Sequence, residues 1–279
     1  MSNQKVWFVT GASKGLGLTL VKRLLKEGYK VAATSRSISD LNKAVDNNDE
    51  QFLPLAVDIK NEDSVQQAIE KTIGTFGKID VVVNNAGYGL LGGLEELTNE
   101  EARENFEVNV FGSLNVIRKV LPYLRGQQSG HILNISSVGG FTGAFPGGGI
   151  YCATKFAVNG FSETLYAEVK PFGIKVTIVQ PGYFRTSFLS QGSLVVPKNQ
   201  IGAYENVRNM INMHQDGMDG QQAGDPEKAA AAMIRITNEA EPPLNLFLGE
   251  DAYGLANEKI ASVQKDLENW KELTTSTSF

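Results

Sequence analysis

Residues 6–17 read VWFVTGASKGLG, an apolar run that passes directly into a glycine-rich turn. The run at 6–9 is typical of a buried strand, and leucines then recur at helical spacing from Leu16 to Leu25. A strand, a glycine turn and a helix in this order leave free backbone N–H groups at the helix N-terminus, where they can bind phosphate oxygens. The spacing Gly-x-x-x-Gly-x-Gly therefore predicts a dinucleotide-binding turn, to which we assign Gly11, Ser13, Lys14, Gly15, Leu16 and Gly17. The alternative is a turn with a structural role alone.

The alternation of strand and helix continues along the chain. Further strands are expected at 31–33, 52–57, 80–84, 131–136, 175–180 and 244–248, and helices at 64–76, 99–124, 150–170, 229–236 and from 250 onward. Pro122 is expected to tighten the end of the helix at 99–124. Unbroken apolar strands separated by amphipathic helices predict an α/β fold, a doubly wound Rossmann-type parallel sheet of about seven strands with helices on both faces. We expect one domain over residues 1–279, with a substrate-loop segment at 187–224 and a C-terminal helical tail at 250–279.

Composition excludes several classes of partner. The chain has 279 residues, 26 Lys and Arg against 31 Asp and Glu, and a formal net charge of −5. Nucleic acids and anionic membranes bind through many basic contacts, so neither is expected as a partner. One cysteine, Cys152, and two histidines do not suffice for a disulfide framework or a metal site, and we predict no metal. We recognise no targeting or membrane-spanning segment, which predicts a cytoplasmic protein.

The end of the second expected strand indicates which dinucleotide is bound. An acidic residue there would bind the ribose hydroxyls of NAD, but this chain has Thr34-Ser35-Arg36 and no carboxylate before Asp40. Guanidinium and ammonium groups suit phosphate oxygens, so Arg36 and Lys14 can hold a 2′-phosphate. This pattern favours NADP(H), with Ser35 and Arg36 in the binding site; the alternative is that both cations are ordinary solvated surface charges.

Two other strand ends carry candidate cofactor contacts. Asp58 and Ile59 close the third strand, where the carboxylate can meet the adenine amino group or instead cap the next helix. The fourth strand ends in Asn84, which can contact the cofactor or only join neighbouring strands. Small residues follow it and would let the backbone lie against the cofactor: Asn85, Ala86 and Gly87.

Tyr151 and Lys155 are the candidate reacting pair. They lie four residues apart on an expected helix, so both side chains share one face. An ammonium beside a phenol stabilises the phenolate and is expected to lower its pKa, which would let Tyr151 exchange a proton with a carbonyl or alcohol oxygen near neutral pH. The preceding strand ends in Ser136-Ser137, where a hydroxyl can bind the same oxygen.

The joint set of motifs resembles the short-chain dehydrogenase/reductase family, in its single-domain, NADP-preferring branch. The motifs are TGASKGLG (10–17), NNAG (84–87), NVFG (109–112), NISS (134–137), YCATK (151–155) and PGYFRT (181–186), and the resemblance covers about residues 5–190. It implies Tyr151 as general acid/base, Lys155 as the group that lowers its pKa and binds the nicotinamide ribose, and Ser137 as the group that polarises the substrate carbonyl. It also implies a relay water held by Asn109, and nicotinamide contacts from Pro181, Gly182 and Thr186.

One spacing departs from the family pattern. Ser137 lies one residue further from Tyr151 than is commonest in the family, and the fixed spacing would fall on Val138, which has no hydroxyl. We infer one inserted residue in the glycine-rich segment 139–149. Ser136 remains an alternative to Ser137, since adjacent strand residues point to opposite faces.

The segment 187–224 has two interpretations. It is either an adaptable lid over an apolar substrate, favoured by its methionines and its place beside the nicotinamide site, or a packed subdomain or oligomer contact. Cys152 is expected to be a packed core thiol, and His214 an exposed side chain. An aromatic wall is expected around the substrate from Tyr88, Phe141, Phe145, Tyr183 and Phe188.

These features predict an NADPH-dependent carbonyl reductase that transfers hydride between the nicotinamide and a ketone, aldehyde or secondary alcohol with an apolar body. The alternatives are an alcohol or hydroxysteroid dehydrogenase that works oxidatively, and a non-catalytic dinucleotide-binding protein. Family habit implies a homodimer or homotetramer.

Overall fold

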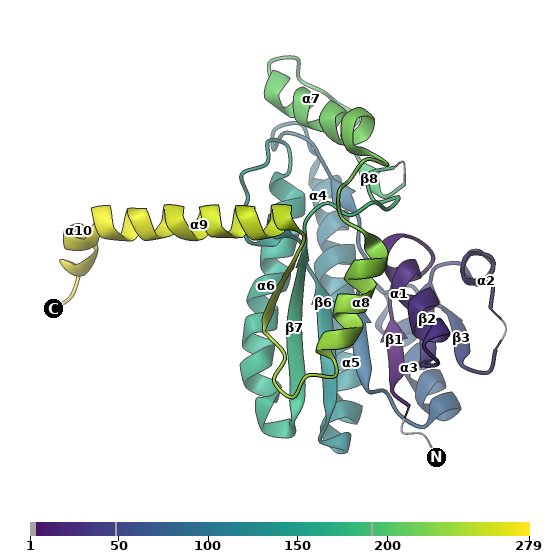
Figure 1. Ribbon diagram of the computed structural model, residues 1–279. Coiled ribbons are helices and arrows are strands. Elements are labelled where there is room, and N and C mark those ends of the chain that lie inside the picture. The colour runs from purple at the N-terminus through teal and green to yellow at the C-terminus, as the bar shows by residue number, and fades with distance from the viewer. Residues whose placement is uncertain (1–3, 48, 191) are drawn as a thin grey trace.

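The computed structural model describes residues 4–47, 49–190 and 192–279, and its centre is a seven-stranded sheet (Figure 1). All neighbouring strands of this sheet are parallel, in the order β3-β2-β1-β4-β6-β7-β9. The strands are β1 (Val6–Val9), β2 (Lys30–Ser35), β3 (Phe52–Ala56), β4 (Val81–Asn84), β6 (Gly130–Ile135), β7 (Ile174–Pro181) and β9 (Asn245–Leu248). The predicted doubly wound parallel sheet is confirmed. The strand order reverses between β1 and β4, and ligands of such sheets bind at the strand C-terminal ends near that point.

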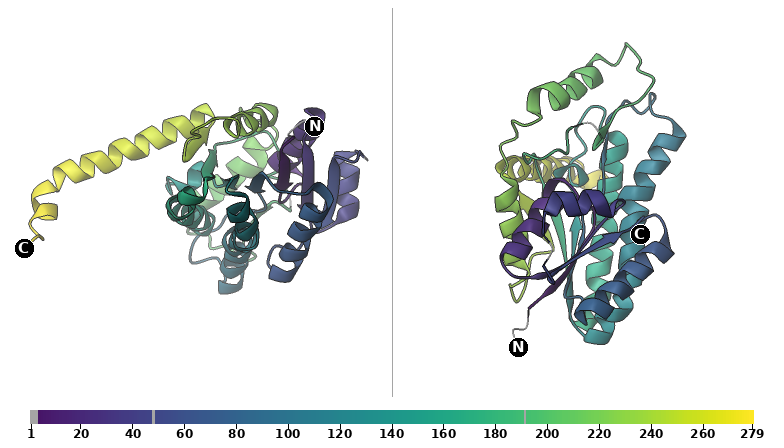
Figure 2. Two further views of the ribbon diagram at one scale, coloured as in Figure 1. Left: turned by 90° about the horizontal axis from the view of Figure 1, so that it is seen from below. Right: turned by 90° about the vertical axis from the view of Figure 1, so that its right-hand side faces the viewer.

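Helices cover both faces of the sheet (Figure 2). Successive residues of β1 point to opposite faces, so Trp7 packs into one apolar cluster and Phe8 into the other, and neither is exposed. On the Trp7 face lie α1 (Gly15–Lys26), α2 (Ile38–Val45) and α8 (Pro226–Ile236). On the Phe8 face lie α3 (Glu62–Phe76), α5 (Gly112–Gln127) and α6 (Gly149–Val169). Burial on both faces explains why the strands have no polar alternation.

The helix expected at 99–124 is interrupted by a wider turn. It consists of α4 (Asn99–Phe106), a π-helical segment η1 (Glu107–Phe111) and α5. Such segments are frequent at functional sites, and Asn109 lies in this one. The expectation for Pro122 was wrong, because Pro122 lies inside α5 and the helix continues past it. Pro122 is on the exposed side of the helix, so the backbone carbonyl that finds no N–H donor at the proline can bond to water instead.

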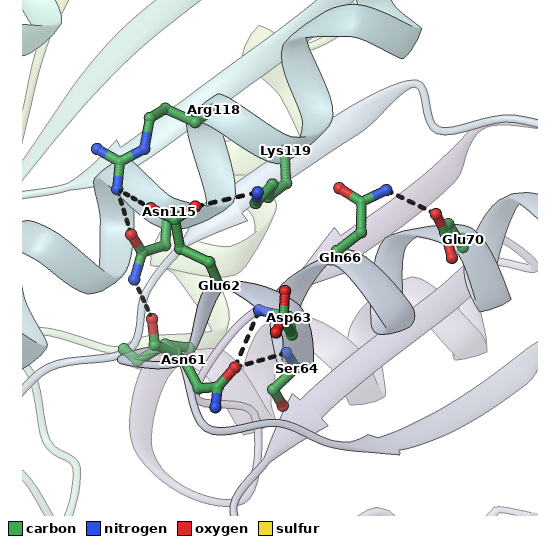
Figure 3. Close-up of polar contacts among 10 residues, drawn as sticks. Asn61, Glu62, Asp63, Ser64, Gln66, Glu70, Asn115, Arg118 and Lys119 are labelled. Atoms are coloured by element: carbon green, nitrogen blue, oxygen red, sulfur yellow. Dashed lines mark hydrogen bonds and ion pairs between the residues drawn. The ribbon is translucent and has the colours of Figure 1, made fainter.

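The start of α3 fixes the loop that follows β3 (Figure 3). Asn61 caps the helix, because its side chain accepts hydrogen bonds from the backbone N–H of Asp63 and Ser64. The capping role considered for Asp58 therefore belongs to Asn61. From α5, the amide of Asn115 donates to the carbonyl oxygen of Ile59 over 2.8 Å. The loop that carries Asp58 and Ile59 is thus held from both sides.

The segment 187–224 is more ordered than the sequence indicated. It contains β8 (Leu194–Val195), which pairs with β5 (Gly89–Leu90), followed by α7 (Glu205–Asn212) and a π-helical segment η4 (Met213–Met218). A small apolar cluster of its own joins it to the loop after β4, and is formed by Leu91, Leu189, Leu194, Val207 and Ile211. Gln191 lies outside the described residues. The geometry fits a packed subdomain, and a mobile lid stays a prediction.

The C-terminal tail forms α9 (Glu250–Asn269) and α10 (Lys271–Thr275), and most of α9 extends away from the rest of the molecule (Figure 1 and the left view of Figure 2). Ala252 and Ala256 are buried at its base. Among the described residues, no helix combines the length and apolarity that a bilayer crossing requires.

Candidate functional site

The glycine turn after β1 lies against the end of β4. Gly11 has a φ of +65°, and a Cβ at this position would come within 2.7 Å of the Cα of Ala86. The Asn85 amide donates to the carbonyl oxygens of Thr10 and Gly11 over 2.9 and 3.0 Å. A Cβ on Gly17 would come within 2.4 Å of the same amide nitrogen. The glycines are therefore needed for close packing, and Asn85 holds the turn with its side chain.

Asn84 joins strands, which was one of its two interpretations. Its amide donates to the Asn134 side chain over 2.8 Å, and the Asn134 amide donates in turn to the Ser162 hydroxyl over 2.8 Å. All three residues are buried. This chain of hydrogen bonds ties β4 to β6 and to α6, and so fixes the helix that carries Tyr151 and Lys155.

Two cations lie at the open end of the glycine turn. Lys14 and Arg36 are both exposed, and neither forms an ion pair with any residue that the structure describes. The pKa of Lys14 is lowered, first by partial burial and then by the nearby charge of Arg36. Two like charges held together without a carboxylate favour an anion between them. Ser35 accepts from the backbone N–H of Ser37 and so shapes the turn beside Arg36.

Tyr151 and Lys155 meet Ser137 where β6 and α6 come together. Lys155 is 6% exposed, donates to the carbonyl oxygen of Ile135 over 2.9 Å, and has its Nζ 5.8 Å from the centre of the Tyr151 ring. The Ser137 hydroxyl lies close enough to the Tyr151 side chain to lower its pKa. Ser136 instead donates to the carbonyl oxygen of Lys155 and is buried. The geometry thus favours Ser137 over Ser136 as the hydroxyl beside the phenol.

Burial dominates the electrostatics of this pair. It raises the pKa of the Tyr151 phenol above its ordinary value, and the hydrogen bond from Ser137 opposes that rise. It also lowers the pKa of Lys155 to about 8. The expectation that Lys155 makes this phenol acidic is therefore not met in this geometry, because the ammonium is bonded to a backbone oxygen and both groups are desolvated. Tyr151 is a protonated phenol at neutral pH.

Asn109 is buried below the site. Its amide donates to the carbonyl oxygen of Tyr88 over 3.0 Å and to the Thr154 hydroxyl over 3.1 Å, and its oxygen accepts from the Tyr88 backbone N–H over 3.0 Å. A Cβ on Gly87 would come within 2.9 Å of that oxygen. Asn109 positions the backbone at 87–88, and its implied relay water remains a prediction.

A cavity of about 1210 Å³ connects the two ends of the site. It runs from the glycine turn, past Arg36 and Asp58, to Tyr151 and Lys155. Of the residues assigned from the sequence, Gly17 and Asn109 do not line it, whereas these do: Gly11, Ser13, Lys14, Gly15, Leu16, Ser35, Arg36, Asp58, Ile59, Asn85, Ala86, Gly87, Ser137, Tyr151, Lys155, Pro181, Gly182 and Thr186.

The apolar wall near Tyr151 comes largely from the segment 187–224. Phe188 lies 6.1 Å from Tyr151 between ring centres, and Leu189 and Leu194 line the cavity beside it. Four of the five expected aromatic residues line the cavity. The exception is Phe141, which packs edge-on against Phe247 at 5.2 Å.

Three contacts around the loop 181–186 and the segment 187–224 could not be inferred from the sequence. Asp251, at the base of α9, accepts from the Tyr183 backbone N–H over 2.7 Å. His214 is buried rather than exposed, and its Nε2 lies 2.9 Å from the Tyr183 hydroxyl. The buried Glu96 accepts from the backbone N–H of Ile201 and pairs with Arg208, so it anchors α7. Each contact joins residues far apart in the chain, and local periodicity carries no signal for it.

Two simpler expectations concern side chains in and near the cavity. Cys152 is buried, and burial raises its pKa to about 11, so it is a packed thiol rather than a nucleophile. Among the described residues, His, Cys, Asp and Glu form no group that could hold a metal ion.

Comparison with known proteins agrees with this geometry. The family model described as short chain dehydrogenase matches residues 5–193. An oxidoreductase of Botryotinia fuckeliana is 36% identical, covering 98% of this chain and 99% of its own length. A 3-ketodihydrosphingosine reductase of Bacteroides thetaiotaomicron is 38% identical, covering 88% of each chain. The chain therefore belongs to the short-chain dehydrogenase/reductase family of oxidoreductases, as its motifs indicated.

Solved structures agree over the fold. A short-chain dehydrogenase from Streptomyces avermitilis is 36% identical and superposes with a TM-score of 0.91, covering 100% of both chains. A 3-ketoacyl-(acyl-carrier-protein) reductase from Brucella melitensis, in complex with NADH, has a TM-score of 0.73 at 27% identity, covering 87% of this chain and 96% of its own. A short chain dehydrogenase from Burkholderia cenocepacia, in complex with NADP, has a TM-score of 0.73 at 26% identity, covering 95% and 97%.

The two serines should separate cleanly on mutation. Ser137→Ala removes the hydroxyl beside the phenol, and kcat should fall about 10²- to 10³-fold, as when one donor to a reacting oxygen is lost. Ser136→Ala removes a hydrogen bond to the backbone, so it should reduce the free energy of unfolding by about 1 kcal/mol while kcat changes far less. Steady-state kinetics and urea denaturation of both variants measure this. A larger loss of kcat in Ser136→Ala would reverse the assignment.

Proposed function

We propose that this protein is an NADPH-dependent carbonyl reductase that reduces a ketone or aldehyde with an apolar body. The observation that carries the proposal is that the phenol of Tyr151, beside Ser137, lies in the same cavity as a glycine turn flanked by two cations that form no ion pair with the described residues. That combination supports a proton donor at one end and a phosphate-bearing dinucleotide along the other.

The residues present fit NADP(H). The cradle at Gly11 admits no side chain, and the backbone can approach a pyrophosphate there. Lys14 and Arg36 supply the charge for a 2′-phosphate, and Asp58 and Ile59 line the adenine end. When bound, the dinucleotide supplies the hydride. Solved relatives carry NADP in one case and NADH in another, so the preference proposed here rests on Lys14 and Arg36.

Tyr151 and Ser137 act on the substrate oxygen. The two hydroxyls lie near each other in one cavity, so both can reach one carbonyl oxygen and stabilise the negative charge that develops on it. Tyr151 then gives its proton to that oxygen as general acid. Lys155 supplies a positive charge 5.8 Å from the ring of the phenolate that remains, although burial outweighs that charge in setting the pKa of the phenol.

The protonated phenol of Tyr151 fits the reductive direction of this proposal. Its raised pKa keeps the phenol protonated at neutral pH, which is the form that donates a proton to a carbonyl. An alcohol dehydrogenase needs the phenolate as base. The cavity wall suits an apolar substrate, since Leu90, Leu189 and Leu194 line it, and one relative is a reductase of 3-ketodihydrosphingosine.

The proton donor is tested by Tyr151→Phe. The change removes the proton while it keeps the ring against Phe188, so reduction should slow by about 10²- to 10⁴-fold, the usual contribution of a positioned acid. NADPH oxidation with a panel of ketones and NADPH binding by fluorescence measure the two effects, and binding should stay nearly unchanged. Tyr166→Phe, on the same helix but in the apolar core, is the control. Wild-type turnover in Tyr151→Phe would refute the role.

The cofactor preference is tested by Arg36→Ala. Losing a charged hydrogen bond to a 2′-phosphate costs about 1.5–3 kcal/mol, so the KM for NADPH should rise about 10- to 100-fold. The KM for NADH, which has no such phosphate, should change little. Lys43→Ala, which removes an exposed cation from α2, is the matched control. A wild-type protein that prefers NADH would contradict the assignment.

The charge on Lys155 predicts a pH dependence. The pKa of Lys155 is about 8, so its ammonium is complete below that pH and is lost above it. The kcat/KM for reduction, which reports groups of the free enzyme, should therefore fall as the pH rises through about 8. Lys155→Arg keeps its charge at all of these pH values, so the residual kcat/KM of this variant should not fall through about pH 8. A wild-type profile that is flat in this region would exclude Lys155 as the titrating group.

A further inference from the structure

The extended part of α9 carries an apolar stripe that nothing in the described chain covers. Tyr253 is 70% exposed, Ile260 52%, Val263 42%, Leu267 59% and Trp270 61%. Every residue from 260 to 279 is exposed. A helix with these side chains in water is marginally stable by itself, because helices of this length owe most of their stability to packing. A partner surface for this stripe is therefore expected.

The spacing of the stripe is that of a coiled coil. Tyr253, Ala256, Ile260, Val263, Leu267 and Trp270 are separated alternately by three and four residues, which places them on one side of the helix in a heptad pattern. Ala256 is covered by the protein's own domain, so the free stripe begins beyond it. The opposite side of the helix is polar, with Glu258 and Lys265.

We propose that a second copy of this chain covers the stripe, with the two α9 helices antiparallel about a twofold axis. In this arrangement Ile260 packs against Val263 of the second copy, and the contact involves only the part of the stripe beyond Ala256. Each contact occurs twice, as an isologous interface requires. The exposed helix is about 20 Å long from Asn257 to Asn269, at 1.5 Å a residue, and the two free stripes meet around Ile260 and Val263.

Charges beside the stripe match this pairing. Lys259 and Asp266 both precede a stripe residue by one position, so they lie along the same edge of it. In the antiparallel register that pairs Ile260 with Val263, Lys259 faces Asp266 of the second copy, and the reverse pair forms by symmetry. Neither residue forms an ion pair within the described chain. One helix thus carries both halves of a self-complementary contact.

The position of the domains excludes the parallel alternative. The body of the protein covers the base of α9 at Ala252 and Ala256, on the side of the stripe. Two parallel helices would bring both bodies to the same end and onto the same side of the stripe. Antiparallel helices place the bodies at opposite ends of the paired segments.

A charge-swap experiment on the full chain tests the proposal. Lys259→Asp places two carboxylates opposite each other at both edges of the contact, and Asp266→Lys places two ammonium groups there. Each should raise the dimer dissociation constant about tenfold, because two weak attractive pairs become repulsive. The double variant K259D/D266K should restore wild-type assembly. Sedimentation velocity over a range of protein concentrations measures this.

Matched controls make the same charge changes on the polar side of α9. Lys265→Asp corresponds to Lys259→Asp, and Glu258→Lys corresponds to Asp266→Lys. Both should assemble as wild type. A further variant, I260D/V263D, should halve the mass of the assembly, from dimer to monomer or from tetramer to dimer if another face also assembles.

Three results would overturn the proposal: a monomeric wild type at all concentrations, an unchanged assembly in I260D/V263D, or single charge variants that the double variant fails to rescue. The first would leave another protein or a surface as the occupant of the stripe. NADPH binding by I260D/V263D checks that the domain remains folded.

Discussion

The site depends on one close approach between backbone segments, where the turn after β1 meets the end of β4. Gly11 lies against Ala86 without room for a side chain, and the Asn85 amide closes the gap by bonding to the carbonyl oxygens of Thr10 and Gly11. This contact fixes the N-terminus of α1 at the point where the strand order reverses. From there β4 is tied through Asn84 and Asn134 to α6, so the glycine turn and the reacting pair share one rigid frame.

The two ends of the cavity work under opposite electrostatic conditions. Lys14 and Arg36 are exposed, where water screens them and a mobile anion can replace that water. Tyr151 and Lys155 are desolvated, which raises the pKa of the phenol and lowers the pKa of the ammonium, so that the neutral form of each group is favoured. In such a site a small displacement of charge changes the electrostatic energy strongly. In the function proposed above, the cavity joins a screened region that binds the dinucleotide to an unscreened region where the proton is transferred.

Most of the fold could be predicted from the sequence, because apolar runs and helical periodicity are local. The seven strands and the faces of β1 follow from Val6–Val9 and its counterparts. The wider turn at Asn109 could not be predicted, since a single extra residue in a helical turn hardly changes the periodicity. Pro122 was misjudged because its position relative to solvent decides whether a helix continues. The choice between Ser136 and Ser137 needed the direction of each side chain.

The electrostatics and the cross-chain contacts were the least predictable part. Residue types placed a phenol one helical turn from an ammonium, but the degree of burial, which depends on the whole fold, determined the direction of both pKa shifts. The buried pair of Glu96 and Arg208, and the contact of His214 with Tyr183, join segments more than thirty residues apart. Such contacts have no local pattern from which to infer them.

Asp251 connects the C-terminal segment to the loop at Gly182 and Tyr183, and these two residues line the cavity. Its carboxylate accepts from the Tyr183 backbone and leaves no room for a side chain on Gly182, although it lies well beyond the segment matched by the family model. The loop at 181–186, which lies next to Tyr151, is therefore held in part by a residue outside the region that the family model matches. Members of this family that differ only in their C-terminal segments can therefore differ in the shape of the cavity.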